Sequence, residues 1–308
     1  MIKAIFIVGP TASGKTSVSI ELAKKFGGEI ISADSMQIYN GIHIASAAPD
    51  EAEKCGVPHH LIEFLELEEQ FSVADYVKLA RETIKDVSAR GKLPIIVGGT
   101  GLYISSLIDN IEFIDQDADF ALRHELEEKF DLLGGEEMLR QLAAFDADSA
   151  NRLHPNNRRR IIRAFEVYLQ TGKTITEQNV LSKQNKGEII PLIIGLNFTD
   201  RQNLYDRINK RVDIMLENGL LAEAEETYKK HNTKGAFQAI GHKELYSYLN
   251  GDTTLESAVE NLKMQTRRYA KRQITWFKRI DEINWFYPDE AGYQNLIFEK
   301  VEKFLKEE

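Results

Sequence analysis

The chain has 308 residues, of which 43% are hydrophobic and 28% charged, the composition of a globular protein with one large domain or two ordinary ones. Its formal net charge of −9 excludes a uniformly basic, histone-like nucleic-acid binder, and its single cysteine excludes a disulfide framework or a multi-cysteine zinc site. No apolar run approaches the roughly 20 residues of a membrane span, and the first residues lack the pattern of a signal peptide, so we expect a cytoplasmic protein without membrane contact.

The N-terminal third alternates between apolar runs and amphipathic helical segments. The apolar runs predict buried strands at residues 4–8, 29–33 and 93–97, and a weaker strand at 60–65. Helical spacing predicts helices at 17–26 and 71–90. Ser72 is the expected N-cap of the second helix, with Asp75 three residues on. Because strands that alternate with helices form parallel sheets with right-handed crossovers, we predict such a sheet here.

The pattern changes in the middle of the chain. Residues 113–188 are polar and helical, with no convincing strand. The apolar run 189–198 predicts that the sheet resumes, and 282–287 is a candidate last strand. Two further long helices are expected at 201–230 and 255–280. We therefore predict an α/β core formed by 1–112 and 189–308, interrupted by an inserted all-helical domain at 113–188.

The charge is unevenly distributed. Residues 109–150 hold thirteen acidic and three basic side chains. Residues 151–163 then hold five arginines and no acid, and 267–279 hold six basic residues interleaved with Tyr269, Trp276 and Phe277. Because local lysine and arginine determine affinity for a polyanion, the acidic total does not exclude nucleic-acid binding. Two solvated helix faces are the alternative interpretation of the basic stretches.

A phosphate-binding motif lies between the first predicted strand and helix. Residues 9–16 read GPTASGKT and match G-x-x-x-x-G-K-[ST] in the strand-to-helix context that this motif requires. Its glycines let backbone N–H groups surround phosphate oxygens at a helix N-terminus. Lys15 would contact the terminal phosphate, and the Thr16 hydroxyl would coordinate Mg²⁺. The motif predicts a P-loop NTPase-like sheet that binds a diphosphate, without saying which one.

The acid that usually completes such a site is missing from its usual strand. The strand at 93–97 ends in glycines rather than in the aspartate of a hydrolytic NTPase. Asp34 instead follows the strand at 29–33, and the carboxyl ends of parallel strands meet at one edge of the sheet. We therefore expect Asp34 near the diphosphate as a general base or a group that orients the nucleophile. The alternative is an ordinary loop or N-cap aspartate.

Seven segments in this order resemble motifs of the tRNA dimethylallyltransferase (isopentenyl-tRNA transferase) family: GPTASGKT, ISADSMQIYNG, GVPHHL, PIIVGGTGLY, HPNNRRRIIRAFE, AIGHKE and RRYAKRQITWF. The resemblance runs from about residue 3 to residue 280. The chain departs from the family pattern at 44–49, which reads IASAAP where the family reads I-G-T-A-K-P. It departs again at His242, where the family has Tyr.

The resemblance implies transfer of the dimethylallyl group of dimethylallyl diphosphate to N6 of the adenosine at tRNA position 37, next to the anticodon. The implied partners are the tRNA anticodon stem-loop and dimethylallyl diphosphate, the implied cofactor is Mg²⁺, and a monomer is expected. Lys15, the loop amides and Mg²⁺ on Thr16 would stabilise the leaving diphosphate. Asp34 would accept the proton of the amine. Arg207 or Arg211 would contact the diphosphate; two solvated helix arginines are the alternative.

The resemblance also assigns the residues. The implied catalytic residues are Asp34, Thr16, Lys15, Arg207 and Arg211. The implied diphosphate loop is Gly9, Pro10, Thr11, Ala12, Ser13, Gly14, Lys15 and Thr16. The implied tRNA contacts are Asp34, Ser35, Met36, Gln37, Thr100, Arg123, Arg159, Arg160, Ile161, Ile162, Arg163, Ile240, Gly241, His242, Lys243, Glu244, Leu245, Arg267, Arg268, Arg272, Gln273 and Trp276. For the aromatic residues of 267–279, core packing is the alternative.

Other functions share parts of this pattern. An adenylate isopentenyltransferase would use the same chemistry on free AMP, ADP or ATP, but it needs neither the insertion nor the basic stretches. A P-loop small-molecule kinase would bind ATP in the same loop. A non-catalytic RNA-binding protein would tolerate loss of Asp34. A metal site at Cys55, His59 and His60 is not favoured, because adjacent histidines in a tight turn rarely share one ion.

Overall fold

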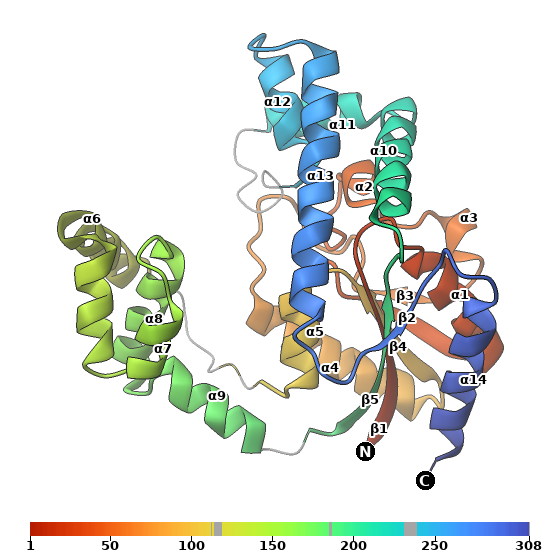
Figure 1. Cartoon of the computed structure of the whole chain (residues 1–308), viewed down its shortest axis with the longest axis horizontal. Helices are drawn as coiled ribbons and strands as arrows, with labels where there is room; N and C mark the ends of the chain where they lie inside the picture. The colour runs from red at the N-terminus through yellow and green to blue at the C-terminus, as the bar shows by residue number, and fades with distance from the viewer. Residues whose placement is uncertain (112, 114–118, 185–186, 231–238, 308) are drawn as a thin grey trace. The chain divides into compact units, whose positions relative to one another are not determined.

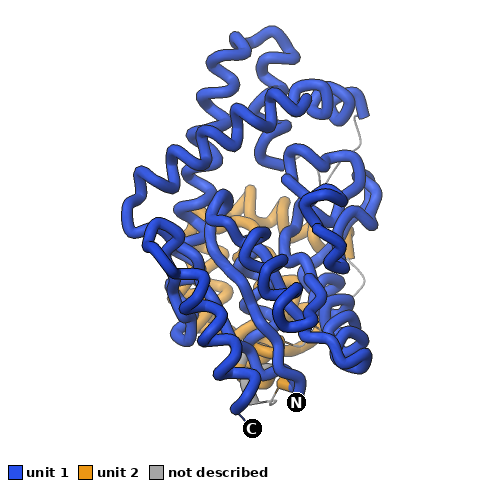
Figure 2. Tube along the Cα trace, turned by 90° about the vertical axis from the view of Figure 1, so that its right-hand side faces the viewer, with its two compact units in different colours: residues 1–108, 188–308 blue, residues 109–187 orange. Residues whose placement is uncertain are grey.

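The computed structural model describes residues 1–111, 113, 119–184, 187–230 and 239–307. The chain divides into two compact units (Figure 2): Met1–Ile108 together with Glu188–Glu308, and Asp109–Gly187. The second unit begins four residues before the predicted start of the insertion at 113 and ends one residue before its predicted end at 188. The acidic residues Glu112, Asp115 and Asp117 near that boundary lie outside the described residues.

The first unit is built on one six-stranded parallel sheet with the order β3-β2-β4-β1-β5-β6 (Figure 1). Its strands are β1 (Ile2–Val8), β2 (Gly28–Ser32), β3 (His59–His60), β4 (Leu93–Gly98), β5 (Ile189–Leu196) and β6 (Asn284–Phe286). The predicted parallel α/β sheet is confirmed. The predicted strand at 60–65 is wrong, because Leu61 and Glu63 adopt positive φ angles of 60° and 49° that end extended pairing after His60.

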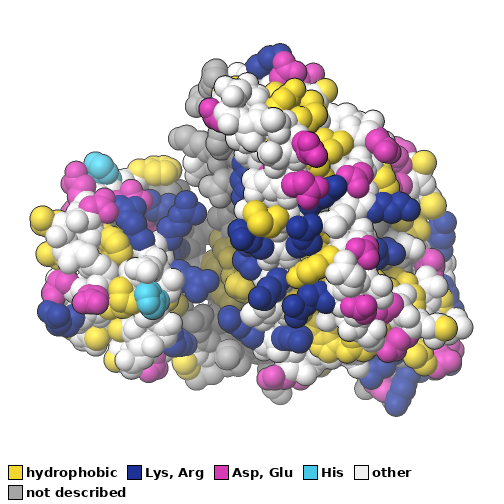
Figure 3. Space-filling view, turned by 45° about the horizontal axis from the view of Figure 1, so that its top comes forward, with side chains coloured by type: hydrophobic (Ala, Val, Ile, Leu, Met, Phe, Trp, Pro, Cys, Tyr) yellow, Lys and Arg dark blue, Asp and Glu magenta, His cyan; other side chains and the backbone are white. Residues whose placement is uncertain are grey.

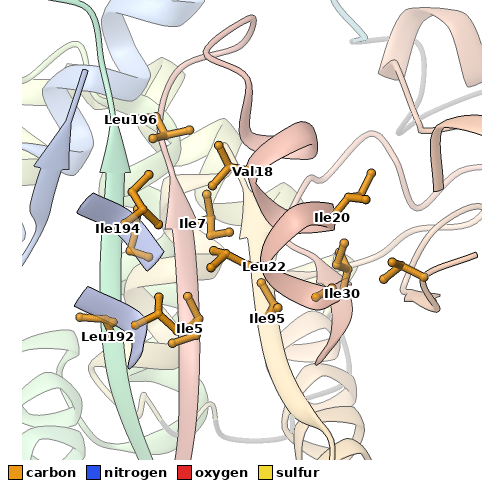
Figure 4. Packing of buried hydrophobic residues seen from close by; sticks show 14 residues of the cluster. Ile5, Ile7, Val18, Ile20, Leu22, Ile30, Ile95, Leu192, Ile194 and Leu196 are labelled. Carbon is orange, nitrogen blue, oxygen red and sulfur yellow. The ribbon is translucent and has the colours of Figure 1, made fainter. Parts of the chain in front are cut away.

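Helices cover both faces of the sheet, which is why its strands read as nearly continuous apolar runs. On one face, Ile5 and Ile7 of β1 pack against Val18 and Leu22 of α1 (Lys15–Phe26), as Figure 4 shows. The C-terminal helix α14 (Tyr293–Lys306), which the sequence analysis did not predict, completes this cluster with Ile297. On the other face lies α4 (Val73–Ala89), which begins with the predicted capping box of Ser72 and Asp75.

The helices after β5 carry side chains to the carboxyl edge of the sheet. The predicted single helix at 201–230 is wrong: α10 (Arg201–Glu217) ends before Gly219, whose φ of +99° starts a new helix, α11 (Leu220–Lys229). The long helix α13 (Leu255–Phe277) follows the short α12 (Lys243–Leu249). The remaining helices of this unit are α2 (His43–Ser46), α3 (Glu51–Lys54) and α5 (Gly101–Ile108).

The second unit is a helical bundle with a core of its own. Its helices are α6 (Phe120–Ala143), α7 (Ala147–Arg152), α8 (Arg158–Thr171) and α9 (Ile175–Gln184). Leu126 and Met138 of α6 pack against Ile161 and Phe165 of α8. No strand occurs among the described residues of this unit. In the described parts of the whole chain, no helix combines the length and apolar character needed to span a membrane.

Candidate active site

The phosphate-binding loop joins β1 to α1 and has the strained backbone of an anion cradle. Gly9 has a φ of +150°, and a Cβ there would lie 2.4 Å from the Leu196 carbonyl oxygen of β5, so only glycine fits. Ala12 and Gly14 also have positive φ, at 63° and 89°. Gly14 is the N-cap of α1 and has no side chain that could accept hydrogen bonds from the first amides of the helix. These amides therefore remain available for an anion.

Lys15 lies folded over this loop. Its Nζ donates hydrogen bonds to the carbonyl oxygens of Gly9 at 3.1 Å and Pro10 at 2.8 Å. Burial lowers the pKa of Lys15 to about 8, while the charge of Asp34 opposes this shift and that of Arg211 adds to it. Burial also lowers the pKa of Arg211, opposed by Asp34 and Glu53. Lys15, Asp34 and Arg211 therefore form one electrostatic group at the loop.

The structure separates the two arginines that the sequence left equivalent. Arg207 is exposed, and its Nε donates a hydrogen bond of 3.0 Å to the Ala12 carbonyl oxygen of the loop. Arg211, one helical turn further along α10, is half-buried beside Lys15 and Asp34. Arg207 thus braces the outside of the loop, whereas Arg211 contributes positive charge inside the site.

Asp34 follows β2 and forms a tight turn with the next residues. Its Oδ1 accepts a hydrogen bond of 2.9 Å from the backbone N–H of Met36. The N–H of Ser35 donates to Thr100 Oγ1 at 2.9 Å, which ties the turn to the glycine-rich segment after β4. Gln37 is held at both ends of its amide: Oε1 accepts from Ser32 Oγ at 2.8 Å, and Nε2 donates to the Ala47 carbonyl oxygen at 3.1 Å.

Three tyrosines that were not predicted as site residues lie within range of the charge of Asp34. Tyr76 and Tyr103 stack with ring centroids 3.9 Å apart, and the Tyr76 hydroxyl is buried with no hydrogen-bond partner among the described residues. Burial, with the nearby charge of Asp34, raises the pKa of Tyr76, Tyr103 and Tyr269. Gln273 and Thr100 partly oppose the rise in the pKa of Tyr269. Helical spacing makes each of them indistinguishable from a core aromatic in the sequence.

Gln273 is buried, which corrects its prediction as a tRNA-binding side chain, whereas the half-buried Trp276 stays a predicted contact. Gln273 is 5% exposed; its Oε1 accepts from the Thr11 N–H of the phosphate loop at 2.9 Å, and its Nε2 donates to the Gly99 carbonyl oxygen at 3.0 Å. The half-buried Trp276 donates its indole N–H to Ser105 Oγ at 2.9 Å and packs against Gly101, where a Cβ would lie 2.4 Å from the ring. Gln273 thus joins α13 to the loops at the sheet edge, and Trp276 joins it to α5.

Basic side chains of α13 and the turn after it remain on the surface. Figure 3 shows lysine and arginine side chains gathered on a face of the first unit. The exposed basic residues of this segment are Arg268, Lys271, Arg272, Lys278 and Arg279. Arg267 is half-buried and donates to Asn209 Oδ1 of α10 at 2.6 Å. Arg268 and Arg272 are therefore free to meet an external anion, whereas Arg267 is partly engaged.

Most of the predicted tRNA contacts at 240–245 are buried. His242 is fully buried, Glu244 and Leu245 are also inside, and Gly241 lies below the surface; Lys243 is exposed and Ile240 half-buried. The two departures from the family pattern meet in this region. A Cβ on Gly241 would lie 3.4 Å from Cβ of Ala45, and His242 contacts the same carboxylate, Glu223, that binds the Ala45 N–H.

In the second unit, the arginines and isoleucines of α8 divide by burial. Ile161 and Ile162 are 0% and 3% exposed in the core, so they cannot be the predicted tRNA contacts. Arg159 and Arg160 are exposed. The exposed residues Arg123 and Arg163 are paired with the buried Glu166, at 2.7 Å and 3.3 Å. The available basic surface of this helix therefore centres on Arg159 and Arg160.

The residues present fit Mg²⁺ only together with a phosphate ligand. No group of three or more metal-ligating His, Cys, Asp or Glu side chains occurs in the described part of the chain. The exposed Thr16 hydroxyl follows Lys15 at the start of α1 and can supply one oxygen, with the others from phosphate and water. His60 binds Glu29 at 2.7 Å and His59 binds the Val57 carbonyl oxygen, so neither is a free ligand beside Cys55.

A glycine-rich turn with a lysine, at the carboxyl end of an interior strand of a parallel sheet, defines this chain as a P-loop-type protein. The model of the IPP transferase family matches residues 37–280. The chain is 48% identical over 309 aligned residues to a tRNA dimethylallyltransferase of Thermoanaerobacter sp. (strain X514), covering 99% of this chain and 98% of that one. It is 47% identical to the tRNA dimethylallyltransferase of Bacillus subtilis (strain 168), covering 92% and 90%. The chain belongs to the tRNA dimethylallyltransferase family.

Solved structures agree with this assignment. The full-length tRNA isopentenylpyrophosphate transferase of Bacillus halodurans superimposes with a TM-score of 0.72 at 42% identity, covering 99% of both chains. A eukaryotic dimethylallyltransferase acting on tRNA superimposes with a TM-score of 0.84 at 29% identity, covering 100% of this chain and 81% of that one. The predicted fold class and the predicted family are therefore confirmed.

Proposed function

We propose that this protein transfers the dimethylallyl group of dimethylallyl diphosphate to N6 of the adenosine at tRNA position 37. The observation that carries the proposal is the single electrostatic group of Lys15, Arg211 and Asp34 at the phosphate loop, in a chain of this family. The two cations can stabilise the negative charge of a departing diphosphate, and the carboxylate can accept the proton that the amine must lose.

The reaction balances with these residues. The bond between C1 and the bridging oxygen of dimethylallyl diphosphate breaks, and the oxygen keeps the electron pair. The adenine N6 forms a new bond to C1 and gives its proton to the Asp34 carboxylate. Lys15, Arg211 and the amides of the loop would stabilise the charge that develops on the diphosphate, because their positive charge and N–H groups lie at the phosphate loop.

The Thr16 hydroxyl and the diphosphate oxygens would hold Mg²⁺ at this site, where the ion would supply further positive charge. We expect the adenine to bind at the turn 34–37, beside the diphosphate; the hydrogen bond from Ser35 to Thr100 that holds this turn supports the assignment. The target base must leave its stack to reach the loop, which is easiest for a nucleotide in a single-stranded loop.

The tRNA surface that we propose has two parts. In the first unit it consists of the exposed Arg268 and Arg272 of α13, with Lys243 of α12. In the second unit it consists of Arg159 and Arg160 of α8, with Arg123 and Arg163 contributing the charge that Glu166 leaves uncompensated. An adenylate isopentenyltransferase or a kinase has no use for these exposed arginines, whereas phosphate contacts with tRNA require them. We propose that the protein is a monomer in the cytoplasm. Analytical sedimentation would test its oligomeric state.

Transfer of a labelled dimethylallyl group to an unmodified tRNA transcript tests the function, with AMP and ATP as competing acceptors and a transcript lacking the position-37 adenosine as control. Label on the tRNA alone, lost with the control transcript, is the expected result. Label on AMP or ATP would instead assign the protein as an adenylate isopentenyltransferase. Phosphate transfer from labelled ATP, without dependence on dimethylallyl diphosphate, would identify a kinase.

A further inference from the structure

The carboxylate of Glu223 in α11 binds backbone N–H groups at the start of α2, almost 180 residues earlier in the chain. Glu223 Oε2 accepts a hydrogen bond of 2.8 Å from the N–H of Ile44, and Oε1 accepts one of 2.9 Å from the N–H of Ala45. The residue before α2, Ile42, has no side chain that can cap a helix. Glu223 therefore satisfies the free amides of α2, and its negative charge suits a helix N-terminus.

The same carboxylate is held in place by a buried histidine. His242 Nε2 donates to Glu223 Oε1 at 2.8 Å. The side chain of His242 is fully buried and that of Glu223 is 11% exposed, so solvent screens this contact little. His242 Nδ1 has no hydrogen-bond partner in the described part of the chain, so the ring is held through Nε2 alone. Glu223 thus accepts three hydrogen bonds with two oxygens.

A hydrogen bond links the C-terminal end of α2 to the proposed adenine-binding turn. The carbonyl oxygen of Ala47, just after α2, accepts from Gln37 Nε2. Gln37 is three residues from Asp34, and its other amide atom is tied to Ser32 at the end of β2. A displacement of α2 would therefore remove one of the two hydrogen bonds that hold the side-chain amide of Gln37.

We propose that Glu223, held by His242, is a positioning residue that sets the turn at 34–37 for the target adenine through α2 and Gln37. Because the side chain of His242 is fully buried and that of Glu223 is 11% exposed, the proposed role is indirect, without contact with a substrate. The inference rests on the proposed function, because it concerns recognition of the tRNA base at that same turn.

The variant Glu223→Gln tests the proposal, since one amide oxygen replaces two carboxylate oxygens and the amide nitrogen meets the backbone N–H groups of α2. We expect kcat/KM for tRNA to fall roughly tenfold or more, as for loss of a charge-assisted hydrogen bond, while KM for dimethylallyl diphosphate stays within about twofold. The backbone amides of Ile44 and Ala45 should exchange hydrogen faster in this variant.

Two histidine variants separate positioning from bulk packing. His242→Gln keeps a donor for Glu223 and should retain most of the activity with tRNA, whereas His242→Leu removes the donor and should behave like Glu223→Gln. Glu226→Gln, an exposed change on the same helix, is the matched control and should leave both KM values unchanged. Thermal unfolding of each variant checks that it is folded.

An unchanged kcat/KM for tRNA in folded Glu223→Gln would overturn the proposal, as would equal losses for both substrates. Equal behaviour of His242→Gln and His242→Leu would remove His242 from it. If the wild-type protein transferred no dimethylallyl group at all, the proposed function would fail. The amide exchange of α2 and the affinity for tRNA would then still report on the role of Glu223.

Discussion

Asp34 shows how one residue type acquires a role from its surroundings. Its Oδ1 is already engaged by the Met36 N–H, which fixes the carboxylate relative to β2. Lys15 and Arg211 supply positive charge nearby, and the hydroxyl groups of Tyr76, Tyr103 and Tyr269 lie in range of its charge. These contacts favour a carboxylate that orients and deprotonates an amine over one that merely caps a turn.

Replacement of Asp34 by Asn keeps an oxygen for the Met36 N–H and removes the basic group. We expect turnover to fall by roughly 10²-fold or more, the usual contribution of a general base, with little change in tRNA affinity. Single-turnover transfer and filter binding measure the two quantities. Asp252→Asn, an exposed change in the turn before α13, is the control. Unchanged turnover in Asp34→Asn would remove the general-base assignment.

The depressed pKa of Lys15 predicts a pH dependence for diphosphate binding. Because burial lowers this pKa to about 8, the free protein loses the Lys15 proton as the pH rises through about 8. Only the protonated form attracts the diphosphate, so kcat/KM for dimethylallyl diphosphate should decline above that pH. Bound diphosphate favours the charged form, so its binding near pH 8 should take up protons. Lys15→Arg should move the decline to higher pH; the same profile in both proteins would show that another group titrates.

At the scale of elements, α13 links the two halves of the proposed chemistry. Its outer face carries Arg268 and Arg272, and its inner face carries Gln273. Through Gln273 the helix touches both the phosphate loop at Thr11 and the segment after β4 at Gly99, where a Cβ would lie 2.0 Å from Gln273 Nε2. The glycines of that segment therefore let α13 approach closely.

The variant Gln273→Met keeps the length of the side chain and removes both hydrogen bonds. We expect affinity for dimethylallyl diphosphate to fall about tenfold, since a buried N–H of the loop loses its acceptor, while tRNA affinity is unchanged. Fluorescence or calorimetric titration with each substrate would show this. Gln265→Met, two turns earlier on α13, is the matched control. Loss of tRNA affinity alone would restore the original assignment of Gln273 to RNA contact.

For the whole molecule, net charge and local charge point in opposite directions. The chain carries −9 overall, yet exposed arginines and lysines gather on α13 and α8. The two units also have separate cores, around Ile7 in the first and Met138 in the second, with no residue in common. The sheet unit holds the proposed chemistry, and each unit has an exposed basic surface of its own that we propose for tRNA.

Removal of Arg159 and Arg160 together, as alanines, should weaken tRNA binding and flatten its salt dependence. Each lost phosphate contact is expected to reduce the slope of log K against log salt by about 0.7 to 0.9. Binding titrations at several salt concentrations measure this slope. Arg140→Ala, an exposed arginine of α6 in the same unit, is the control. An unchanged slope would show that α8 does not meet the phosphates.

Local patterns in the sequence were enough for much of the architecture. The alternation of apolar runs, the phosphate loop and the Ser72 capping box depend on residues close together in the chain, so hydrophobic period and turn chemistry predict them. The family followed from motifs of the same local kind. The missed break at Gly219 and the missed strand end after His60 depend on single backbone angles: Gly219 has a positive φ that glycine allows, and Leu61 and Glu63 have positive φ angles that their residue types rarely adopt.

Tertiary structure alone decided which side chains of a motif face inward. Ile161, His242 and Gln273 lie in segments that resemble tRNA-binding motifs, yet each is buried against residues of other elements. Gln273 binds a loop 262 residues earlier, and Glu223 binds amides almost 180 residues earlier. Such contacts exist only once the sheet has brought distant strands together, because a hydrogen bond depends on position in space and carries no periodic signal in the sequence.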